Sequence, residues 1–300
     1  MTLTIQPLTR HLGGEASGVD LSQPLTQDMI DAINAGMDQY GMLVFRNQPL
    51  TQTEQLNLAK SFGPLDMGLK KLKVRKDRLE HPELADLSNV TDDASGVVEP
   101  THKKIVGNIA NQLWHSDSSF QRPAARYSML AAVRVPSDGG DTEYTDLRAA
   151  YDALSEPMKS ELAELQAEHY ALHSRFLLGD TDYTEEQKAT LPPVLWPMVR
   201  VHPGSGRKVL FVSSHARAIE GMSLAEGRMM LFDLLEHATQ PEFRYRHQWQ
   251  PNDLVIWDNR CTLHRGRRFN LKQVRELRRA TTLDVDAPEL TLEERETANA

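Results

Sequence analysis

The sequence predicts a mainly β protein with flanking helices, built around a two-sheet jelly roll, the double-stranded β-helix. Short apolar segments of strand length recur from Ser128 onward. Turn-forming sequences such as Asp138-Gly-Gly140 and Pro203-Gly-Ser-Gly206 separate these segments, and many short strands split by such turns are typical of jelly rolls. The predicted strands are 129–135, 142–144, 169–173, 199–201, 209–212, 243–249, 254–257 and 279–283.

The N-terminal region is predicted to form a layer of two helices around one strand. Apolar residues follow Thr26 at helical spacing and Gly41 can close the segment, which predicts a helix over 27–39. The apolar run 42–45 follows as a buried strand. The sequence Thr51-Gln-Thr-Glu54 is a capping box that starts a second helix, and Gly63-Pro64 is expected to end it.

The remaining segments complete a prediction of one domain over residues 1–285. Residues 68–104 are polar and lack clean periodicity, which indicates long loops or a mobile lid. Two helices interrupt the later strands, and Asp180 to Pro197 is predicted to be an insertion near the barrel mouth. The acidic tail 286–300 is expected to be flexible. The two interrupting helices are 147–165, broken near Ser155-Glu-Pro157, and 223–237, with a capping box of Ser223 and Glu226.

Composition limits the classes of partner. Apolar residues make up 40% of the 300 residues and charged residues 25%, as in ordinary globular proteins. The formal charge of -8 argues against nucleic acid or an anionic membrane as the main partner. No apolar run reaches the roughly 20 residues of a membrane span, and no signal segment is evident at the start. The single cysteine, Cys261, agrees with a reducing, cytoplasmic location and is interpreted as a packed thiol rather than a ligand.

Two imidazoles and one carboxylate form the strongest candidate site. His115 and Asp117 are two positions apart, so both side chains can point to the same side of an extended segment. His264 follows the predicted apolar strand 254–257 and is expected at a turn, so a rigid element would hold it in place. Two histidines and one carboxylate that leave other positions open suit a non-haem Fe(II) site. A surface turn with an ordinary histidine is the alternative for the His-x-Asp sequence alone.

Arginines downstream of His264 are candidates for binding an anion. An iron site of this kind needs an electron source such as a 2-oxo acid, whose distal carboxylate a planar guanidinium holds well. Arg275 and Arg279 lie four residues apart, and the second begins a predicted strand. A solvated basic face formed by Arg275, Arg278 and Arg279 is the alternative interpretation.

These residues together resemble the taurine/2,4-dichlorophenoxyacetate dioxygenase (TauD/TfdA) family of Fe(II)/2-oxoglutarate enzymes. The likeness covers about residues 1–285. The residues that carry the likeness to the family are His115-x-Asp117, Gly139-Gly-Asp-Thr142, Trp257-Asp-Asn259, His264, Arg275 and Arg279. Within the family the chain is most similar to the aryloxyacetate enzymes. That similarity lies in Asn111-Gln-Leu-Trp-His-Ser-Asp-Ser-Ser-Phe120, Pro123-Ala-Ala-Arg-Tyr-Ser-Met129 and Ser174-Arg-Phe-Leu-Leu-Gly-Asp-Thr-Asp-Tyr183.

The resemblance implies a role for each matching residue. The iron ligands would be His115, Asp117 and His264. Thr142 and Arg275 would hold the distal carboxylate of 2-oxoglutarate, with Trp257 packed beside it. The residues implied to bind the primary substrate are Arg279, Lys71, His202 and Ser118.

The same resemblance implies the reaction. An aryloxyacetate such as 2,4-dichlorophenoxyacetate would be hydroxylated next to its ether oxygen, giving a phenol and glyoxylate with succinate and CO2, as in herbicide degradation. Fe(II), 2-oxoglutarate and O2 would be required, ascorbate would support activity, and the protein would form a homo-oligomer. A sulfonate or another small carboxylate as substrate, and a metal-binding jelly roll without activity, are the alternatives.

The sequence departs from the aryloxyacetate enzymes at two places. A second lysine of their lid falls near Gly96 here, with Lys103 and Lys104 a few residues later. A histidine that follows the position of His215 is replaced by Ala218. Both departures bear on the range of substrates rather than on the class of reaction.

Overall fold

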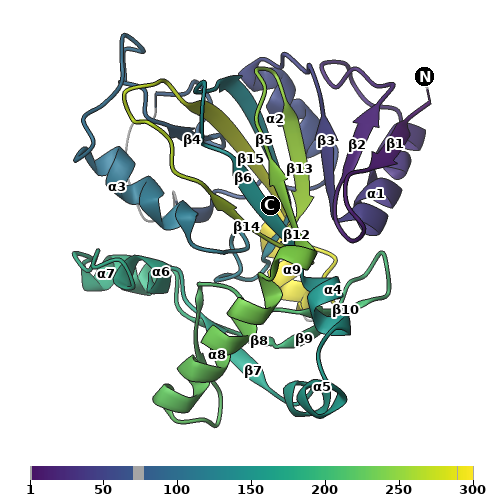
Figure 1. Ribbon diagram of the computed structural model, residues 1–300, viewed down its shortest axis with the longest axis vertical. Coiled ribbons are helices and arrows are strands. Elements are labelled where there is room, and N and C mark those ends of the chain that lie inside the picture. The colour runs from purple at the N-terminus through teal and green to yellow at the C-terminus, as the bar shows by residue number, and fades with distance from the viewer. Residues whose placement is uncertain (1, 70–77, 289, 300) are drawn as a thin grey trace.

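A seven-stranded sheet forms the largest layer of the described molecule (Figure 1). The computed structural model describes residues 2–69, 78–288 and 290–299. Neighbouring strands of this sheet run antiparallel except β2 and β3, which are parallel. In spatial order the strands are β1 (Thr4–Pro7), β2 (Gly14–Ser17), β3 (Met42–Phe45), β13 (Leu254–Asp258), β5 (Ala125–Arg134), β15 (Glu276–Leu283) and β4 (Ala85–Ser88).

Smaller sheets complete the β structure of the described residues. The first is ordered β12 (Arg244–His247), β6 (Thr142–Asp146) and β14 (Thr262–Gly266). The second is ordered β11 (Ala216–Ile219), β7 (Gln166–His169) and β8 (Val194–Pro197). The third pairs β10 (Lys208–Leu210) with β9 (Val199–Val201).

Helices lie around these sheets (Figure 1). They are α1 (Gln27–Tyr40), α2 (Gln52–Lys60), α3 (Lys103–Ile109), α4 (Leu147–Asp152), α5 (Glu156–Leu162), α6 (His173–Phe176), α7 (Glu185–Thr190), α8 (Leu224–Ala238) and α9 (Leu292–Asn299), with 3-10 turns η2 (Ala110–Gln112) and η3 (Pro241–Phe243). None of the described helices is both long and apolar enough to cross a bilayer.

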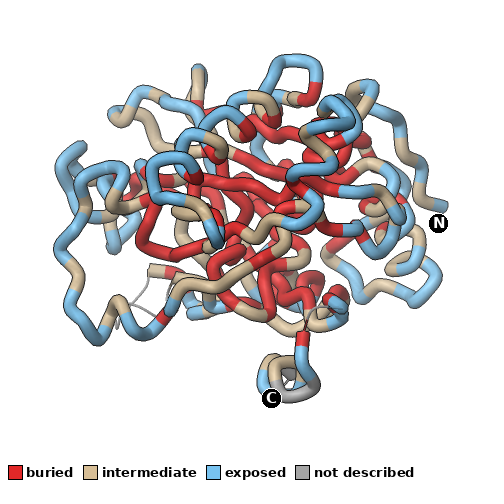
Figure 2. The backbone as a smooth tube through the Cα atoms, turned by 90° about the horizontal axis from the view of Figure 1, so that it is seen from below, coloured by how far each residue is buried: buried red, intermediate tan, exposed pale blue. Residues whose placement is uncertain are grey.

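Strand β3 shows how the large sheet is packed on both faces. Leu43 and Phe45 belong to the cluster that contains residues of α1 and α2, whereas Met42 and Val44 pack with Tyr144 of β6. Successive side chains of a strand point to opposite faces. One face of the large sheet is therefore covered by helices and the other faces the β12-β6-β14 sheet, which confirms the predicted jelly roll. Figure 2 shows the buried residues gathered in the middle of the molecule.

The capping signals placed the N-terminal helices well. Thr26 accepts a hydrogen bond from the backbone N–H of Met29, and Gly41 ends α1 with φ 68. Thr51 and Glu54 form the predicted capping box of α2. Ser223 caps α8, but its hydroxyl donates to the Glu226 carboxylate at 2.6 Å, so the predicted reciprocal box is not formed.

Several predicted loops contain regular structure. The predicted strand 169–173 is wrong, because β7 ends at His169 and α6 begins at His173. A short apolar run indicates that a segment is buried, but it does not distinguish a strand from a helix. Within 68–104 the described residues form β4 and the start of α3, and 180–197 contains α7 and β8. The tail forms α9 and buries Ala287 and Leu290.

Candidate metal centre and adjoining cavities

Backbone pairing brings His115 and His264 together. An isolated antiparallel bridge joins the two residues, with N–H to carbonyl distances of 3.0 and 2.8 Å. The ring centroids lie 4.1 Å apart. His264 sits within β14, opposite Tyr144 of β6, and the two rings stack at 6.1 Å. Two segments distant in the sequence therefore present their imidazoles side by side.

Asp117 completes the group predicted from the sequence. Its Oδ1 lies 3.7 Å from Nε2 of His115, and its Oδ2 lies 3.9 Å from Nε2 of His264. The three side chains are buried, and their ligand atoms lie within 4.8 Å of one another. Two imidazole nitrogens and a carboxylate at this spacing fit a divalent transition metal such as Fe(II).

The protonation states favour metal binding. Nδ1 of His115 is 2.8 Å from the Leu113 carbonyl, to which it can donate, so Nε2 is left as an acceptor. Burial lowers the pKa of His115. Burial and the neighbouring His115 lower the pKa of His264 well below its usual value. Both imidazoles are therefore neutral at pH 7, as a metal ligand must be.

Asp117 is held by several neighbours. The Ser128 hydroxyl donates to Oδ2 at 2.6 Å, and the Asp117 backbone N–H donates to Oδ1 of Asn259 at 3.0 Å. Nη1 of Arg279 donates to Oδ1 of Asp117 at 2.5 Å. Burial raises the pKa of Asp117, but the charge of Arg279 and the hydrogen bond from Ser128 act against burial, and the pKa is lowered to about 2. The carboxylate is therefore ionised.

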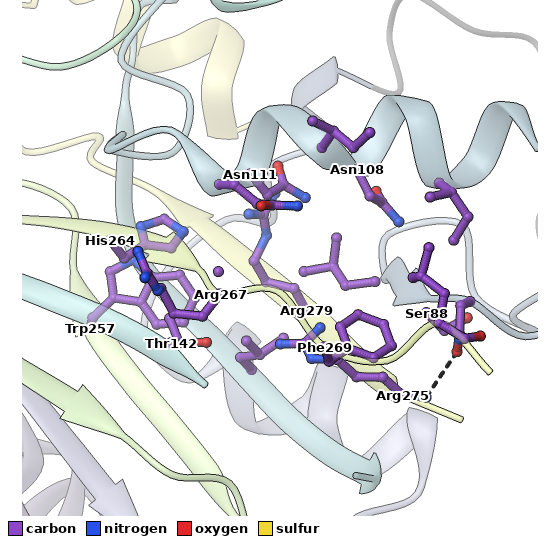
Figure 3. Close-up of a pocket in the computed structure, with 18 residues that line it drawn as sticks. Ser88, Asn108, Asn111, Thr142, Trp257, His264, Arg267, Phe269, Arg275 and Arg279 are labelled. Carbon is purple, nitrogen blue, oxygen red and sulfur yellow. Dashed lines mark hydrogen bonds between the residues drawn. The ribbon is translucent and has the colours of Figure 1, made fainter. Parts of the chain in front are cut away.

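A cavity of about 770 Å³, open to solvent, adjoins His264. Its lining includes Thr142, Trp257, Arg275 and Arg279 (Figure 3). In that view Thr142, Trp257 and His264 lie together at one side, and Asn108 and Asn111 approach from the segment of α3 and η2. The rest of the wall is largely apolar, with Leu87, Ile105, Ile109, Leu130, Phe269 and Leu271.

Arg275 is an available anion-binding group in this cavity. Its Nε donates to the Gly140 carbonyl at 3.1 Å, and it forms no ion pair with a carboxylate in the described part of the chain. Burial lowers its pKa to about 10, so the guanidinium is still charged at neutral pH. Thr142 accepts a hydrogen bond from Nε1 of Trp249 at 3.0 Å, which leaves its own proton to donate.

A second cavity lies at the side of His115 and Asp117. It is lined by Gly68, Leu69, Ala110, Asn111, His115, Asp117, Ser118, Phe120, Ser174, Arg175, His215 and Arg279. The predicted substrate residue Ser118 is thus near the metal centre, where its hydroxyl donates to Asp66 at 2.5 Å. Arg279 borders both cavities.

The predicted substrate residue His202 is not brought to this site. His202 is buried elsewhere, with Nε2 2.9 Å from Oδ2 of Asp258 and Nδ1 2.9 Å from the Ser205 hydroxyl, and it lines neither cavity. Both its nitrogens contact protein atoms, and a role in substrate binding stays a prediction. Lys71 lies outside the described residues.

Sequence reasoning missed the residues that support the ligands. Asn259 receives hydrogen bonds from Asp117 and from Nε1 of Trp257, and it donates to the Ser128 hydroxyl. Asn259 belongs to the Trp257-Asp-Asn259 motif, and its place in that motif is a sequence signal that could have marked it as a residue of the site. Arg175, which lines the second cavity, also belongs to one of the family-like motifs, 174–183.

Comparisons with known proteins agree with this site. The family model described as "Taurine catabolism dioxygenase TauD, TfdA family" matches residues 4–281. The chain is 56% identical over 284 residues to the alpha-ketoglutarate-dependent 2,4-dichlorophenoxyacetate dioxygenase of Cupriavidus pinatubonensis, covering 95% of this chain and 99% of that protein. It is 36% identical over 278 residues to the (S)-phenoxypropionate/alpha-ketoglutarate-dioxygenase of Sphingobium herbicidovorans, covering 90% and 91%.

A solved structure is also similar along nearly its whole length. The crystal structure of AAD-2 in complex with Mn(II) and N-oxalylglycine matches with a TM-score of 0.89 and 44% identity, covering 94% of this chain and 98% of that chain. Because the family model, the full-length relatives and the fold agree, the chain belongs to the taurine catabolism dioxygenase TauD, TfdA family.

Proposed function

We propose that this protein is an Fe(II)/2-oxoglutarate-dependent dioxygenase that hydroxylates an aryloxyacetate such as 2,4-dichlorophenoxyacetate. The observation that carries the proposal is 56% identity, over 99% of its length, to a relative named for that reaction. The buried group of His115, Asp117 and His264 supplies the ligand set that the reaction needs.

The three residues of that group are proposed to hold the iron. When bound, Fe(II) with 2-oxoglutarate and O2 supplies the oxidant for hydroxylation, while 2-oxoglutarate becomes succinate and CO2. The protein contributes neutral imidazoles and an ionised carboxylate, and Ser128 and Asn259 orient the carboxylate.

Arg275 and Thr142 are proposed to hold the distal carboxylate of 2-oxoglutarate. Arg275 and Thr142 line the same cavity, and burial lowers the pKa of the Arg275 guanidinium. A buried cation without a carboxylate partner is stabilised by an anionic ligand, and the fork of arginine matches a carboxylate geometrically. Trp257, in the same lining, would pack against the dicarboxylate.

Arg279 is proposed to bind the carboxylate of the primary substrate, because it borders both cavities next to Asp117. Ser118 is near enough to contribute, and the role of Lys71 stays a prediction.

The products follow from the position of the hydroxyl group. Hydroxylation of the carbon between the ether oxygen and the carboxylate gives a hemiacetal. Its C–O bond to the aryl oxygen breaks, the hydroxyl proton passes to the phenolate, and a phenol and glyoxylate are released. Of the two oxygen atoms of O2, one enters the hemiacetal and the other enters succinate.

A product assay tests this function. Purified protein with Fe(II), 2-oxoglutarate and ascorbate is expected to release phenol from aryloxyacetates and no sulfite from taurine. Asp117→Ala should abolish phenol release. Sulfite release without phenol would instead select a sulfonate substrate, and metal retention without any 2-oxoglutarate-dependent O2 uptake would favour a binding protein.

A cytoplasmic location and a homo-oligomeric assembly are also proposed. The single cysteine, Cys261, is buried and free, which agrees with a reducing compartment. Light scattering of the purified protein at micromolar concentration measures the assembly directly.

A further inference from the structure

Arg175 of α6 borders the metal centre from a cavity that Arg275 does not line. The Arg175 cavity contains His115 and Asp117, whereas the Arg275 cavity contains Thr142 and Trp257. Arg279 lines both. Arg175 and Arg279 also line a third, more polar hollow together. The two arginines are therefore neighbours in both the Arg175 cavity and this third hollow.

The other cations of that third hollow are already neutralised. Lys104 donates to Asp86 at 2.7 Å, and Arg78 pairs with Asp86 at 3.1 Å and with Glu276 at 2.6 Å. Arg279 forms an ion pair with Asp117 at 2.5 Å. Each of these groups therefore has a carboxylate within hydrogen-bond distance.

Arg175 has no such partner among the residues that the structure describes. Its polar neighbours are the Tyr183 hydroxyl and, beyond hydrogen-bond distance, the Asp180 carboxylate, to which that hydroxyl donates at 2.8 Å. Burial lowers the pKa of Arg175. Burial outweighs the charge of Asp180, and a half-buried guanidinium without a carboxylate in hydrogen-bond distance carries a desolvation cost that an anionic ligand would offset.

The rest of the Arg175 cavity fits an aromatic acid. Leu69 and Phe120 give it an apolar wall, and His215 packs edge-on against Phe120 with ring centroids 4.9 Å apart. Asp66 closes the neighbouring hollow, where Ser118, Gln121 and the Gly68 N–H donate to its carboxylate. An anion would therefore lie toward the two arginines and away from Asp66.

We infer that Arg175 binds the carboxylate of the primary substrate together with Arg279, and that Arg175 makes the enzyme selective for acids over neutral aryl ethers. The inference rests on the proposed function, because it assigns a second carboxylate-binding residue to the same substrate. A charge-assisted hydrogen bond is worth about 1.5–3 kcal/mol, or roughly a 10- to 150-fold change in affinity.

The test compares Arg175→Gln and Arg175→Lys with wild type. For Arg175→Gln we expect the KM for 2,4-dichlorophenoxyacetate to rise by roughly 10-fold or more, while the KM for 2-oxoglutarate and the Ki of neutral 2-(2,4-dichlorophenoxy)ethanol, used as a competitor, stay within about twofold. Arg175→Lys should recover part of the loss, because it keeps the positive charge.

Arg217→Gln is the matched control. Arg217 is half-buried over the Tyr170 ring at 5.1 Å and pairs with Glu168, but it lines neither cavity, so its KM values should not change.

If wild type releases phenol, the proposed function holds, and either of two results would then overturn the inference alone. One is an unchanged KM for the acid in Arg175→Gln. The other is a Ki for the neutral competitor that rises by the same factor as the KM for the acid, which would indicate a structural role. If Arg175→Gln does not fold, Arg175→Lys gives the same comparison. If wild type releases phenol from no aryloxyacetate, the proposed function fails and this inference fails with it.

Discussion

Asp117 is oriented by hydrogen bonds as well as by its neighbouring histidines. Ser128 donates to Oδ2, the oxygen that lies nearer His264, while Arg279 holds Oδ1. Such partners set the direction of a ligand's lone pairs and the basicity of the ligand. The metal affinity of the site therefore depends on residues that never touch the metal.

Ser128→Ala tests this dependence. We expect metal affinity or turnover to fall by about 10- to 100-fold, measured by Mn(II) titration and by phenol release. Ser61→Ala, which removes an exposed hydroxyl bonded to the Asn57 carbonyl, serves as the control. Equal affinities for Ser128→Ala and wild type would show that Arg279 and the backbone suffice.

Tyr144 carries a buried hydroxyl that makes no hydrogen bond within 3.5 Å to the described residues, and the Thr142 side chain is its polar neighbour. Leaving such a group unpaired costs about 1–3 kcal/mol, so Tyr144→Phe should keep or raise the free energy of unfolding. Tyr127 is equally buried, but its hydroxyl donates to Asn34 at 3.1 Å, and Tyr127→Phe should lower that free energy by about 1 kcal/mol. Urea unfolding of both variants measures these free energies. A lower free energy of unfolding in Tyr144→Phe than in wild type would contradict the prediction.

At the scale of the elements, the end of α1 depends on a backbone conformation that suits glycine. Gly41 has φ 68, its N–H donates to the Met37 carbonyl at 2.7 Å, and an added Cβ would lie 2.9 Å from Nη2 of Arg148. Gly41→Ala should therefore destabilise the fold by about 1–2 kcal/mol or more.

Gly107→Ala is the matched control for Gly41→Ala. Gly107 lies inside α3 with no atom near its Cβ position. Alanine is favoured over glycine in a helix by about 1 kcal/mol, so thermal unfolding should show opposite shifts for the two variants. Shifts of the same sign would refute the structural explanation.

The elements that could be predicted from the sequence carry local signals. Thr26, Thr51 and Ser223 mark helix starts because a cap acts within four residues. Strand β4 has the polar sequence Ala-Asp-Leu-Ser, and its place is determined by pairing with β15, nearly 200 residues later. No local pattern reports such a pairing, since strand formation depends on the neighbours that a strand meets.

The candidate site divides in the same way. His115 and Asp117 could be predicted because residue type and spacing suffice. His264 was expected at a turn after an apolar strand, but it lies within β14, where it pairs with Tyr144. The contact of His202 with Asp258, 56 positions away, could not be predicted from local sequence, and its substrate role stays a prediction. The sequence gives no signal for Arg175, because it comes to line a cavity with Asp117 and Arg279 only in the folded chain.

At the scale of the whole molecule, buried histidines couple stability to pH in two directions. Burial lowers the pKa of His169 to about 3 and that of His173 to about 4. Burial opposes protonation of His202, but Cys261 and Asp258 outweigh it and raise its pKa to about 10. The folded state thus keeps some histidines neutral and one charged.

The sign of each effect follows from proton binding. Below about pH 6.5 the unfolded chain binds more protons at His169 and His173, so stability should fall as the pH drops. Between about pH 6.5 and 10 the folded state binds more at His202, so stability should fall as the pH rises. Urea midpoints across this range should show a maximum near neutrality, and His202→Gln should flatten the alkaline side. An unchanged alkaline slope in His202→Gln would contradict the assignment.

The whole molecule is also predicted to unfold as one unit over residues 1–285. The large sheet joins β1 and β2 near the N-terminus to β15 near residue 283, so no separate body can unfold without breaking it. The mobility of 68–104 and of 286–300 stays a prediction.

The most direct measurement of the central claim is turnover of 2,4-dichlorophenoxyacetate under ¹⁸O₂. We expect phenol and succinate in equal amounts, with one ¹⁸O atom in each succinate, and no phenol when 2-oxoglutarate or O2 is left out. Phenol formed without O2, accompanied by glycolate, would indicate ether hydrolysis and contradict the account.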